Sequence, residues 1–166
     1  MRVSTVLNRL LALEGASVSG VRLSGEGVIV RVRLSRRRMA CSVCGQVYSA
    51  MHDRGLRRWR HLDLAGYRCF IEYELRRVAC RDCGVRVEAV SWARPGARHT
   101  REFEQLVAFC AQRMAKSQVQ ALLRVAWATV GRIITRVVAE RLDERRLEGL
   151  VRIGVDGSPT GAGTAI

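Results

Sequence analysis

Six cysteines occur in this chain of 166 residues, and four of them stand in two matching turns. Cys41 and Cys44 are separated by two residues and followed by glycine, and Cys80 and Cys83 repeat this C-x-x-C-G arrangement. Two intervening residues let a tight turn aim both sulfurs at one point. The glycine can adopt the positive φ that brings backbone N–H groups toward those sulfurs. The pattern predicts that the four thiolates bind one structural zinc ion in a closed tetrahedral site.

Two other interpretations of these cysteines stay open at the level of sequence. A pair of disulfides would require an oxidising compartment, and four unrelated cysteines could each lie in a core. The first 13 residues carry Asn8 and Arg9 inside their apolar part, so they lack the uninterrupted apolar run of a signal peptide. No segment approaches the length of a membrane span. We therefore expect a cytoplasmic protein without membrane contact, in which reduced thiols are free to bind metal.

The charge of the chain points to a polyanionic partner. Lysine and arginine total 29 against 15 acidic residues, which gives a net charge of +14. Double-stranded DNA is the expected partner, because basic side chains neutralise backbone phosphates. Lys116 is the single lysine, and arginine can grip phosphate with two donors or read a guanine edge. Codon usage in a GC-rich genome remains an open explanation for the choice of arginine, but it does not explain the net charge.

The N-terminal residues predict a helix and a β-hairpin. Val3, Val6, Leu7 and Leu10 recur at helical spacing within residues 2–13, and apolar residues alternate on both sides of the glycine turn at residues 25–27. The solvent face of the second hairpin strand carries two arginines that we expect to lie along a DNA backbone: Arg31 and Arg33. A merely solvated strand face is the competing interpretation.

Residues 51–64, between the two cysteine turns, are expected to be the most basic loop of the chain. Three of its arginines predict further phosphate contacts: Arg57, Arg58 and Arg60. Trp59 either stacks on a base or anchors the loop to the ribbon. His52 or His61 could replace a cysteine at the metal, although four cysteines already complete the site.

The residues after this loop predict a strand that returns to the second cysteine turn. Alternating apolar residues from Tyr67 to Leu75 form that strand, with Cys69 on its apolar face as a buried thiol. A further strand covers residues 85–89. The pattern then breaks at residues 92–96, where we place the main domain boundary.

After residue 97 the apolar period changes from two to 3.6, which predicts a helical module over residues 98–148. Thr100 is placed to cap a first helix, whose apolar stripe includes Cys110. Ser117 and Gln120 form the capping-box pattern of a second helix that ends at Arg124. A third helix is expected from about residue 127 to residue 142.

A short helix, a brief turn and a longer helix, in this order, are typical of a helix-turn-helix. We expect the outward face of the third helix to enter the major groove, and its DNA-contacting candidates are Trp127, Thr129, Arg132 and Arg136. A plain helical hairpin remains open, because Gln120, Arg124 and Ala126 stand where a small residue, glycine and serine are usual. The predicted fold class is therefore α+β, divided into an N-terminal helix and hairpin (1–38), a four-cysteine zinc ribbon (39–97), the helix-turn-helix (98–148) and a last segment (149–166) that contains a strand at residues 151–155.

With these motifs in place, the chain resembles the front part of bacterial insertion-sequence transposases of the ISL-three family. The resemblance rests on the paired cysteine turns, the segments 58–66 and 87–97, the helices through Val138, and residues 152–156. It implies a zinc ribbon and a helix-turn-helix that bind the terminal inverted repeats of the element. It also implies a following ribonuclease-H-like domain whose DDE carboxylates act with two Mg²⁺ ions.

Asp156 stands where the first catalytic aspartate of that family would lie, and residues 157–166 then depart from the family pattern. A truncation or frameshift near Asp156 is the simplest account of this departure. Two-metal chemistry needs several converging carboxylates, so we expect this chain alone neither to cut nor to join DNA, and expect Mg²⁺ only in a full-length relative. Possible protein partners are a second copy and a full-length transposase.

A stand-alone zinc-ribbon and helix-turn-helix regulator of transcription is the second functional interpretation. The unfinished strand at residues 151–155 fits it poorly. The nucleotides downstream of the stop codon would separate the two, because a catalytic domain continuing in another frame supports the transposase fragment.

Overall fold

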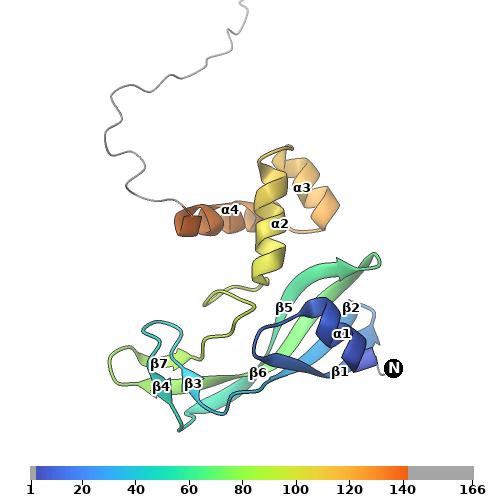
Figure 1. Cartoon of the computed structure of the whole chain (residues 1–166). Coiled ribbons are helices and arrows are strands. Elements are labelled where there is room, and N and C mark those ends of the chain that lie inside the picture. The colour runs from blue at the N-terminus through green and yellow to red at the C-terminus, as the bar shows by residue number, and fades with distance from the viewer. Residues whose placement is uncertain (1–2, 142–166) are drawn as a thin grey trace, which may run out of the picture.

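The computed structural model describes residues 3–141, which form a strand-rich part beneath a group of helices (Figure 1). The helices are α1 (Val3–Leu11), α2 (Arg101–Ala111), α3 (Lys116–Leu123) and α4 (Trp127–Arg141). The strands are β1 (Ala16–Ser24), β2 (Gly27–Leu34), β3 (Met39–Ala40), β4 (Val47–Tyr48), β5 (Asp53–Leu64), β6 (Tyr67–Cys80) and β7 (Gly84–Val87). The described residues therefore have the mixed α+β character expected from the sequence.

The strands form a large sheet and a small one. The large sheet has the order β1-β2-β6-β5, and β7 pairs with the end of β6. Its neighbours are antiparallel except β2 and β6, which run parallel. Strands β3 and β4 pair separately. Because β2 pairs with β6, the expected boundary between residues 1–38 and 39–97 runs through a single sheet.

The expectation of a loop at residues 51–64 is wrong, because most of this segment is strand β5. It pairs antiparallel with β6 from Asp53↔Arg77 to Leu64↔Tyr67. The strand was not predicted, because arginines occupy positions where alternating apolar residues usually indicate a strand. Trp59 is only 2% exposed, and its ring meets that of Trp92 edge-on at 5.8 Å between centroids. Trp59 thus anchors the strand in the core and does not face a base.

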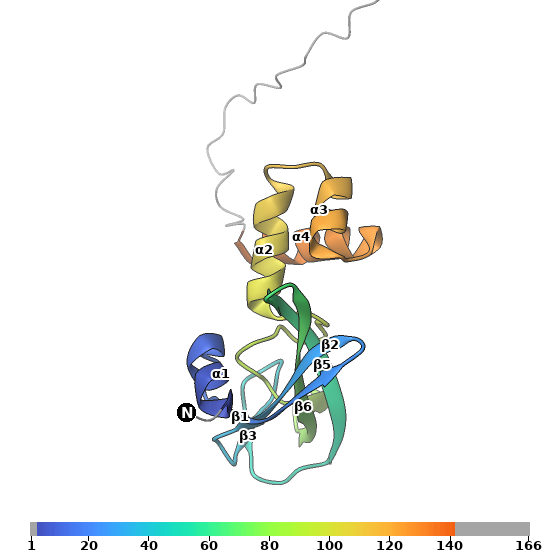
Figure 2. The same ribbon diagram turned by 90° about the vertical axis from the view of Figure 1, so that its right-hand side faces the viewer.

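The main core lies on one face of the large sheet. Its buried side chains come from β2, β5, β6 and the segment before α2, and include Val30, Trp59, Ile71 and Trp92. Helix α1 covers the neighbouring hairpin (Figure 2). Its Leu7 side chain belongs to this core. The side-chain oxygen of Asn8 accepts a hydrogen bond from the Val18 N–H at 2.6 Å, which fixes α1 against β1.

A second core joins the three later helices. Phe103 and Val107 of α2 pack with Val119 of α3 and with Ile133 of α4, all at most 1% exposed. Helix α2 begins as predicted, because Thr100 accepts a hydrogen bond from the Phe103 N–H. Figure 1 shows α2 above the sheet and α4 crossing α2.

The capping box expected at Ser117 is wrong, because the N-cap lies two residues earlier, at Ala115, and α3 begins at Lys116. Ala115 is the N-cap, and its side chain offers no oxygen to the free N–H groups of the first turn. Gln118 instead accepts a hydrogen bond from the Ala115 N–H at 3.0 Å. The glutamine three residues after the true cap therefore supplies one of the two hydrogen bonds of a capping box, the one to the backbone N–H of the cap residue.

A buried carboxylate joins three strands of the large sheet. Glu72 of β6 is completely buried and accepts hydrogen bonds from Arg22 of β1, Arg31 of β2 and Arg58 of β5. Burial alone would raise the pKa of Glu72, but the three guanidinium groups reverse this effect and lower it below its ordinary value. A carboxylate whose pKa is lowered by folding stabilises the folded state while it is ionised.

We predict that Glu72→Gln lowers the free energy of unfolding by about 1–3 kcal/mol, because three arginines lose their shared charge partner. The difference from the unsubstituted chain should be full above the ordinary glutamate pKa of 4.5 and should shrink as the pH falls through the lowered pKa. Urea unfolding at several pH values measures it. Glu74→Gln, at an exposed position two residues further along the same strand, is the matched control and should change stability by less than about 0.5 kcal/mol.

Candidate metal centre and nucleic-acid interface

The two cysteine turns come together at one end of the large sheet. The first turn lies between β3 and β4, and the second between β6 and β7. Their glycines, Gly45 and Gly84, have φ of +77° and +72°, the left-handed conformation that was expected. The Ser42 N–H donates to the Val87 carbonyl at 3.1 Å, so the first turn is also held to the strand that leaves the second.

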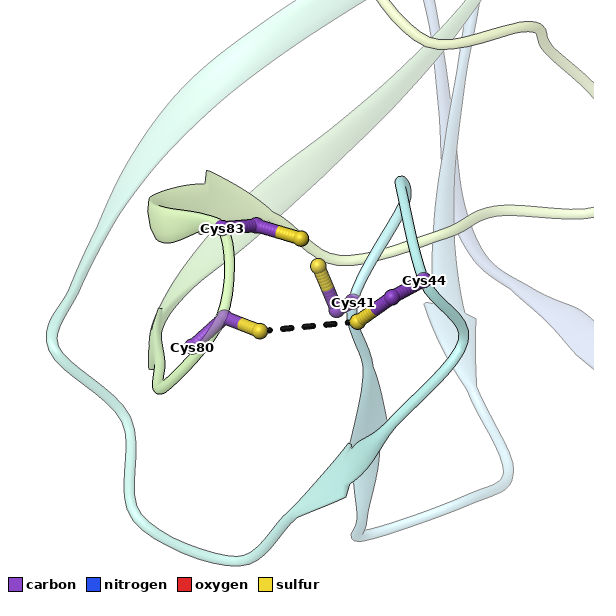
Figure 3. A group of neighbouring side chains, drawn as sticks. All are labelled: Cys41, Cys44, Cys80 and Cys83. Atoms are coloured by element: carbon purple, nitrogen blue, oxygen red, sulfur yellow. Dashed lines mark hydrogen bonds between the residues drawn. The ribbon is translucent and has the colours of Figure 1, made fainter.

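The sulfur atoms of Cys41, Cys44, Cys80 and Cys83 converge on a common centre (Figure 3). All four lie within 4.8 Å of one another, and those of Cys44 and Cys80 are 3.5 Å apart. Tetrahedral zinc with Zn–S bonds of about 2.3 Å requires sulfur separations of about 3.8 Å. The donor set and its spacing therefore fit one zinc ion. Four thiolates leave no position for a reacting water, so such an ion would be structural.

The surroundings of the cluster favour thiolate at Cys80. The Tyr48 hydroxyl has two acceptors for its one proton, Gln46 Oε1 at 2.7 Å and the Cys80 sulfur at 3.2 Å, and it accepts a hydrogen bond from the Arg81 N–H at 3.1 Å. Hydrogen bonding from Tyr48, followed by backbone N–H groups of the second turn, lowers the pKa of Cys80 to about 6. Burial among the other sulfurs raises the pKa of Cys83 to about 12. Tyr48 was not among the residues predicted from the sequence, although its place four residues after Cys44 was a usable signal.

The other candidate ligands lie elsewhere in the described part of the chain. Cys69 is buried in the main core, and burial raises its pKa to about 11, as expected for an inert thiol. Cys110 belongs to the helical core. The ring of His61 is buried 2.9 Å from the Thr100 hydroxyl. His61 therefore helps to join β5 to the start of α2 instead of replacing a cysteine.

The arginines of the sheet that were predicted to contact DNA differ in how many partners they have within the protein. Arg31 and Arg58 both bind Glu72, and Arg58 also pairs with Glu26 at 2.9 Å. Arg33 donates to the Ser17 hydroxyl at 3.2 Å. Arg57 lies over the Trp59 ring at 5.9 Å. Most of these guanidinium groups thus have an intramolecular role before any DNA arrives.

Arg60 departs most from expectation, because it is only 7% exposed. Its guanidinium lies 5.6 Å from the Phe70 ring and 5.3 Å from the Phe103 ring. Its backbone donates to the Arg98 carbonyl and accepts from the Thr100 N–H, both at 2.9 Å. Arg60 therefore lies at the junction where the sheet meets the helices.

The outward face of α4 presents some of the expected DNA-contacting residues. Trp127 is 51% exposed at the start of the helix, with the Lys116 ammonium 4.1 Å from its ring centroid. Arg132 is exposed and donates to the Thr129 hydroxyl at 3.2 Å. Arg136 instead pairs with Glu104, a completely buried carboxylate of α2.

Glu104 is the centre of a second charge network, which was not predicted from the sequence. It accepts a hydrogen bond at 2.6 Å from Arg94, which lies in the segment before α2. Arg94 also contacts Glu140 near the end of α4, and Arg101 binds the same carboxylate at 2.9 Å. The network fixes α4 across α2. The sequence feature that indicates this network is an acidic residue at an inward-facing position of an amphipathic helix.

The turn of the helix-turn-helix is also fixed to the sheet. Arg124 has a φ of +52°, the left-handed conformation usually taken by glycine at this place. Its guanidinium contacts Asp63 and donates to the Gly66 carbonyl at 2.9 Å, so it reaches the turn between β5 and β6. These contacts compensate for a backbone conformation that costs a non-glycine residue free energy.

Asp156 and the rest of the expected final strand lie outside the described residues, so the vestigial catalytic position stays a prediction. Within residues 3–141, no helix is long and apolar enough to cross a membrane.

Comparisons with known proteins match two ranges of this chain. Residues 37–83 match the family model of the zinc-finger of transposase IS204/IS1001/IS1096/IS1165. Residues 88–138 match that of the helix-turn-helix domain of transposase family ISL3. The matched ranges contain the cysteine turns and the helices through Val138, respectively.

Two similar proteins are transposases of named insertion sequences. The chain is 44% identical over 138 residues to the transposase for insertion sequence element IS1557 of Mycobacterium tuberculosis, a match covering 80% of this chain and 30% of that protein. It is 30% identical over 132 residues to the transposase for insertion sequence element IS1001 of Bordetella parapertussis, covering 77% and 30%. The chain thus matches under a third of the length of either relative. No solved structure matches it.

We predict that the purified chain contains one zinc ion and that Cys41→Ser, Cys44→Ser, Cys80→Ser or Cys83→Ser each lowers this content. Removing the metal should unfold the end of the sheet that holds the cysteine turns, because site formation and folding share the same free energy. Elemental analysis and circular dichroism before and after chelation measure both effects. Cys110→Ala is the control and should retain its zinc. A metal-free chain with this end still folded would contradict the assignment.

We further predict that Tyr48→Phe weakens zinc affinity by about 10–100-fold, because it removes a hydrogen bond that favours the Cys80 thiolate. The substitution also raises the pKa of Cys80, so protons should displace zinc at a higher pH than in the unsubstituted chain. Competition with a chromophoric chelator measures the affinity. Tyr67→Phe, at an exposed position far along β6, should leave affinity unchanged. Equal affinities for the two variants would assign Tyr48 to packing alone.

Proposed function

This chain belongs to the ISL3 family of insertion-sequence transposases, and we propose that its described residues bind the terminal repeats of the element through α4. The observation that carries the proposal is the arrangement of the helices. Helix α3, the turn at Arg124 and helix α4 follow each other as in a helix-turn-helix, and α4 presents Trp127 and Arg132 on its exposed face. Such a helix reads base edges in the major groove.

A structural zinc ion at the four cysteines would support this binding without taking part in chemistry. Bound zinc supplies folding free energy to a small unit that has few apolar side chains of its own. Met39, Cys41, Val78 and Cys80 are the buried members of the core at this end of the sheet. The cysteine turns hold this end together, and exposed arginines nearby add positive charge: Arg81 and Arg86.

Binding to DNA divides into phosphate contacts and base contacts. The sheet arginines are suited to phosphate contacts, because they lie on strands and not on a helix that could enter a groove. They are Arg33 and Arg57, together with the exposed sides of Arg31 and Arg58. Arg132 is suited to a base edge, because its side-chain partner within residues 3–141 is the Thr129 hydroxyl on its own helix. Arg136 contributes mainly by fixing α4 through Glu104.

The matched part of this chain corresponds to 30% of each relative, so cutting and joining of DNA would belong to regions outside it. The described residues would then place the element end for a catalytic region. A second copy and a full-length transposase are the proposed protein partners.

We predict that Arg132→Gln weakens binding to a duplex carrying the element end by about 1–3 kcal/mol and weakens binding to random duplex DNA much less. A base contact contributes only on the correct sequence, whereas a phosphate contact contributes on both. Fluorescence anisotropy with both duplexes at one stated salt concentration measures the difference.

Arg113→Gln is the matched control for charge. Arg113 is exposed just after α2, where its guanidinium lies 3.8 Å from the Phe109 ring centroid, and it should affect both duplexes slightly and equally. Equal losses on the two duplexes for Arg132→Gln would show that α4 contacts the backbone only. Absence of binding by the unsubstituted chain to either duplex would refute the proposed function itself.

A further inference from the structure

A small pocket lies where the sheet meets the start of α4. Its volume is about 220 Å³, and its lining includes Arg60 and Phe70 from the sheet, Arg68 beside the β5–β6 turn, and Arg124 and Thr129 from the helix-turn-helix. Three arginines from three separate segments therefore surround one hollow. None of the zinc ligands lines it.

The buried arginine of this pocket lacks part of its hydrogen bonding. Arg60 Nη1 has no hydrogen-bond partner within the described residues. Its Nη2 lies against the Asp63 carboxylate, but without hydrogen-bond geometry. A buried guanidinium normally has partners for its donors, because leaving one unpaired costs free energy. Arg60 is thus a fixed positive charge that the protein itself satisfies incompletely.

The charge balance of the pocket is also positive. Asp63 contacts both Arg60 and Arg124, so one carboxylate serves two guanidinium groups. No ion pair or side-chain hydrogen bond joins Arg68 to another residue in the range 3–141. His99 lines the same pocket, and burial, followed by Arg136 and Arg60, lowers its pKa to about 4, so it carries no compensating or additional charge at neutral pH. The three arginines of the pocket and the single carboxylate of Asp63 therefore leave a net charge of two positive charges.

The first turn of α4 adds to this field. Ala126 and Thr129 line the pocket, and α4 is a helix of 15 residues whose N-terminal end carries the positive end of its dipole. Free backbone N–H groups and a hydroxyl are common partners of phosphate at such a helix start.

We propose that this pocket binds a single phosphate group of the DNA backbone. Arg68 and Thr129 contact its oxygens at the rim, and Arg60 supplies positive charge from beneath. Arg124 holds the pocket together by tying the helix-turn-helix to the β5–β6 turn.

The position of the pocket favours a duplex backbone as the source of this phosphate. A helix that enters the major groove by its N-terminal end brings that end next to the phosphates that border the groove. The pocket opens beside this same end of α4. A phosphate bound here would contact sheet and helices at once, so the two parts of the chain would bind DNA as one body.

This inference rests on the proposed DNA binding, and the experiment separates the two. Affinity for a random-sequence duplex is measured between about 50 and 200 mM salt for the unsubstituted chain, Arg68→Gln, Arg60→Met and the control Arg9→Gln. Each neutralised phosphate contributes about 0.9 to the slope of log affinity against log salt. Arg9 is an exposed residue of α1 that does not line the pocket.

We expect Arg68→Gln and Arg60→Met each to reduce the magnitude of the slope by about one, while Arg9→Gln leaves it unchanged. Across this salt range the affinity of the pocket variants should then fall roughly 3.5-fold less than that of the unsubstituted chain. Methionine keeps the apolar stem of Arg60 between the two rings, and thermal unfolding with zinc content confirms that both variants fold. If Arg60→Met does not fold, Arg68→Gln at the exposed rim decides alone.

Slopes equal to that of Arg9→Gln would overturn the pocket as a DNA site while leaving the proposed function intact. Loss of inorganic phosphate binding by Arg68→Gln with an unchanged DNA slope would also overturn it, because the site would then take a free anion. No DNA binding by the unsubstituted chain would reject both proposals together.

Discussion

The structure depends on neutralising arginine inside an unusually basic chain. A net charge of +14 destabilises the compact state by self-repulsion, which internal partners for some of the guanidinium groups reduce. Three buried carboxylates provide them: Glu72 within the large sheet, Glu88 beside the cysteine turns and Glu104 between the helices. Each accepts from at least one arginine of another segment. Charge pairing therefore specifies how the segments meet, while the apolar cores supply most of the burial.

This pairing also divides the arginines by role. Arg94 and Arg136 surround Glu104 and fix α4 against α2, so they position the helix that we propose to bind DNA. Arg68 and Arg132 have no acidic partner within residues 3–141 and are free for phosphates or bases. A count of basic residues predicts attraction to DNA, but only their pairing shows which ones can supply affinity without loosening the fold.

The sheet and the later helices are joined more closely than a ribbon and a helical module on a linker would be. Arg60 contributes backbone hydrogen bonds to the segment before α2, and Arg124 reaches from the helix-turn-helix to the β5–β6 turn. Leu62 of β5 packs into the helical core. These contacts hold α4 at a fixed angle to the sheet. A duplex bound by α4 would therefore meet the sheet arginines in one defined register.

The sequence by itself determined the features that depend on local spacing: the two cysteine turns with their glycines, the hairpin, the strand returning to Cys80, and the amphipathic helix capped by Thr100. Tertiary structure alone decided that β2 pairs in parallel with β6 and that residues 51–64 are mostly strand. It also decided that Arg60 is buried. The physical reason is the same in each case. A guanidinium group looks solvent-exposed in a sequence, and only contacts such as those of Glu72 with Arg22 and Arg31, 50 and 41 residues away, decide where its charge is neutralised.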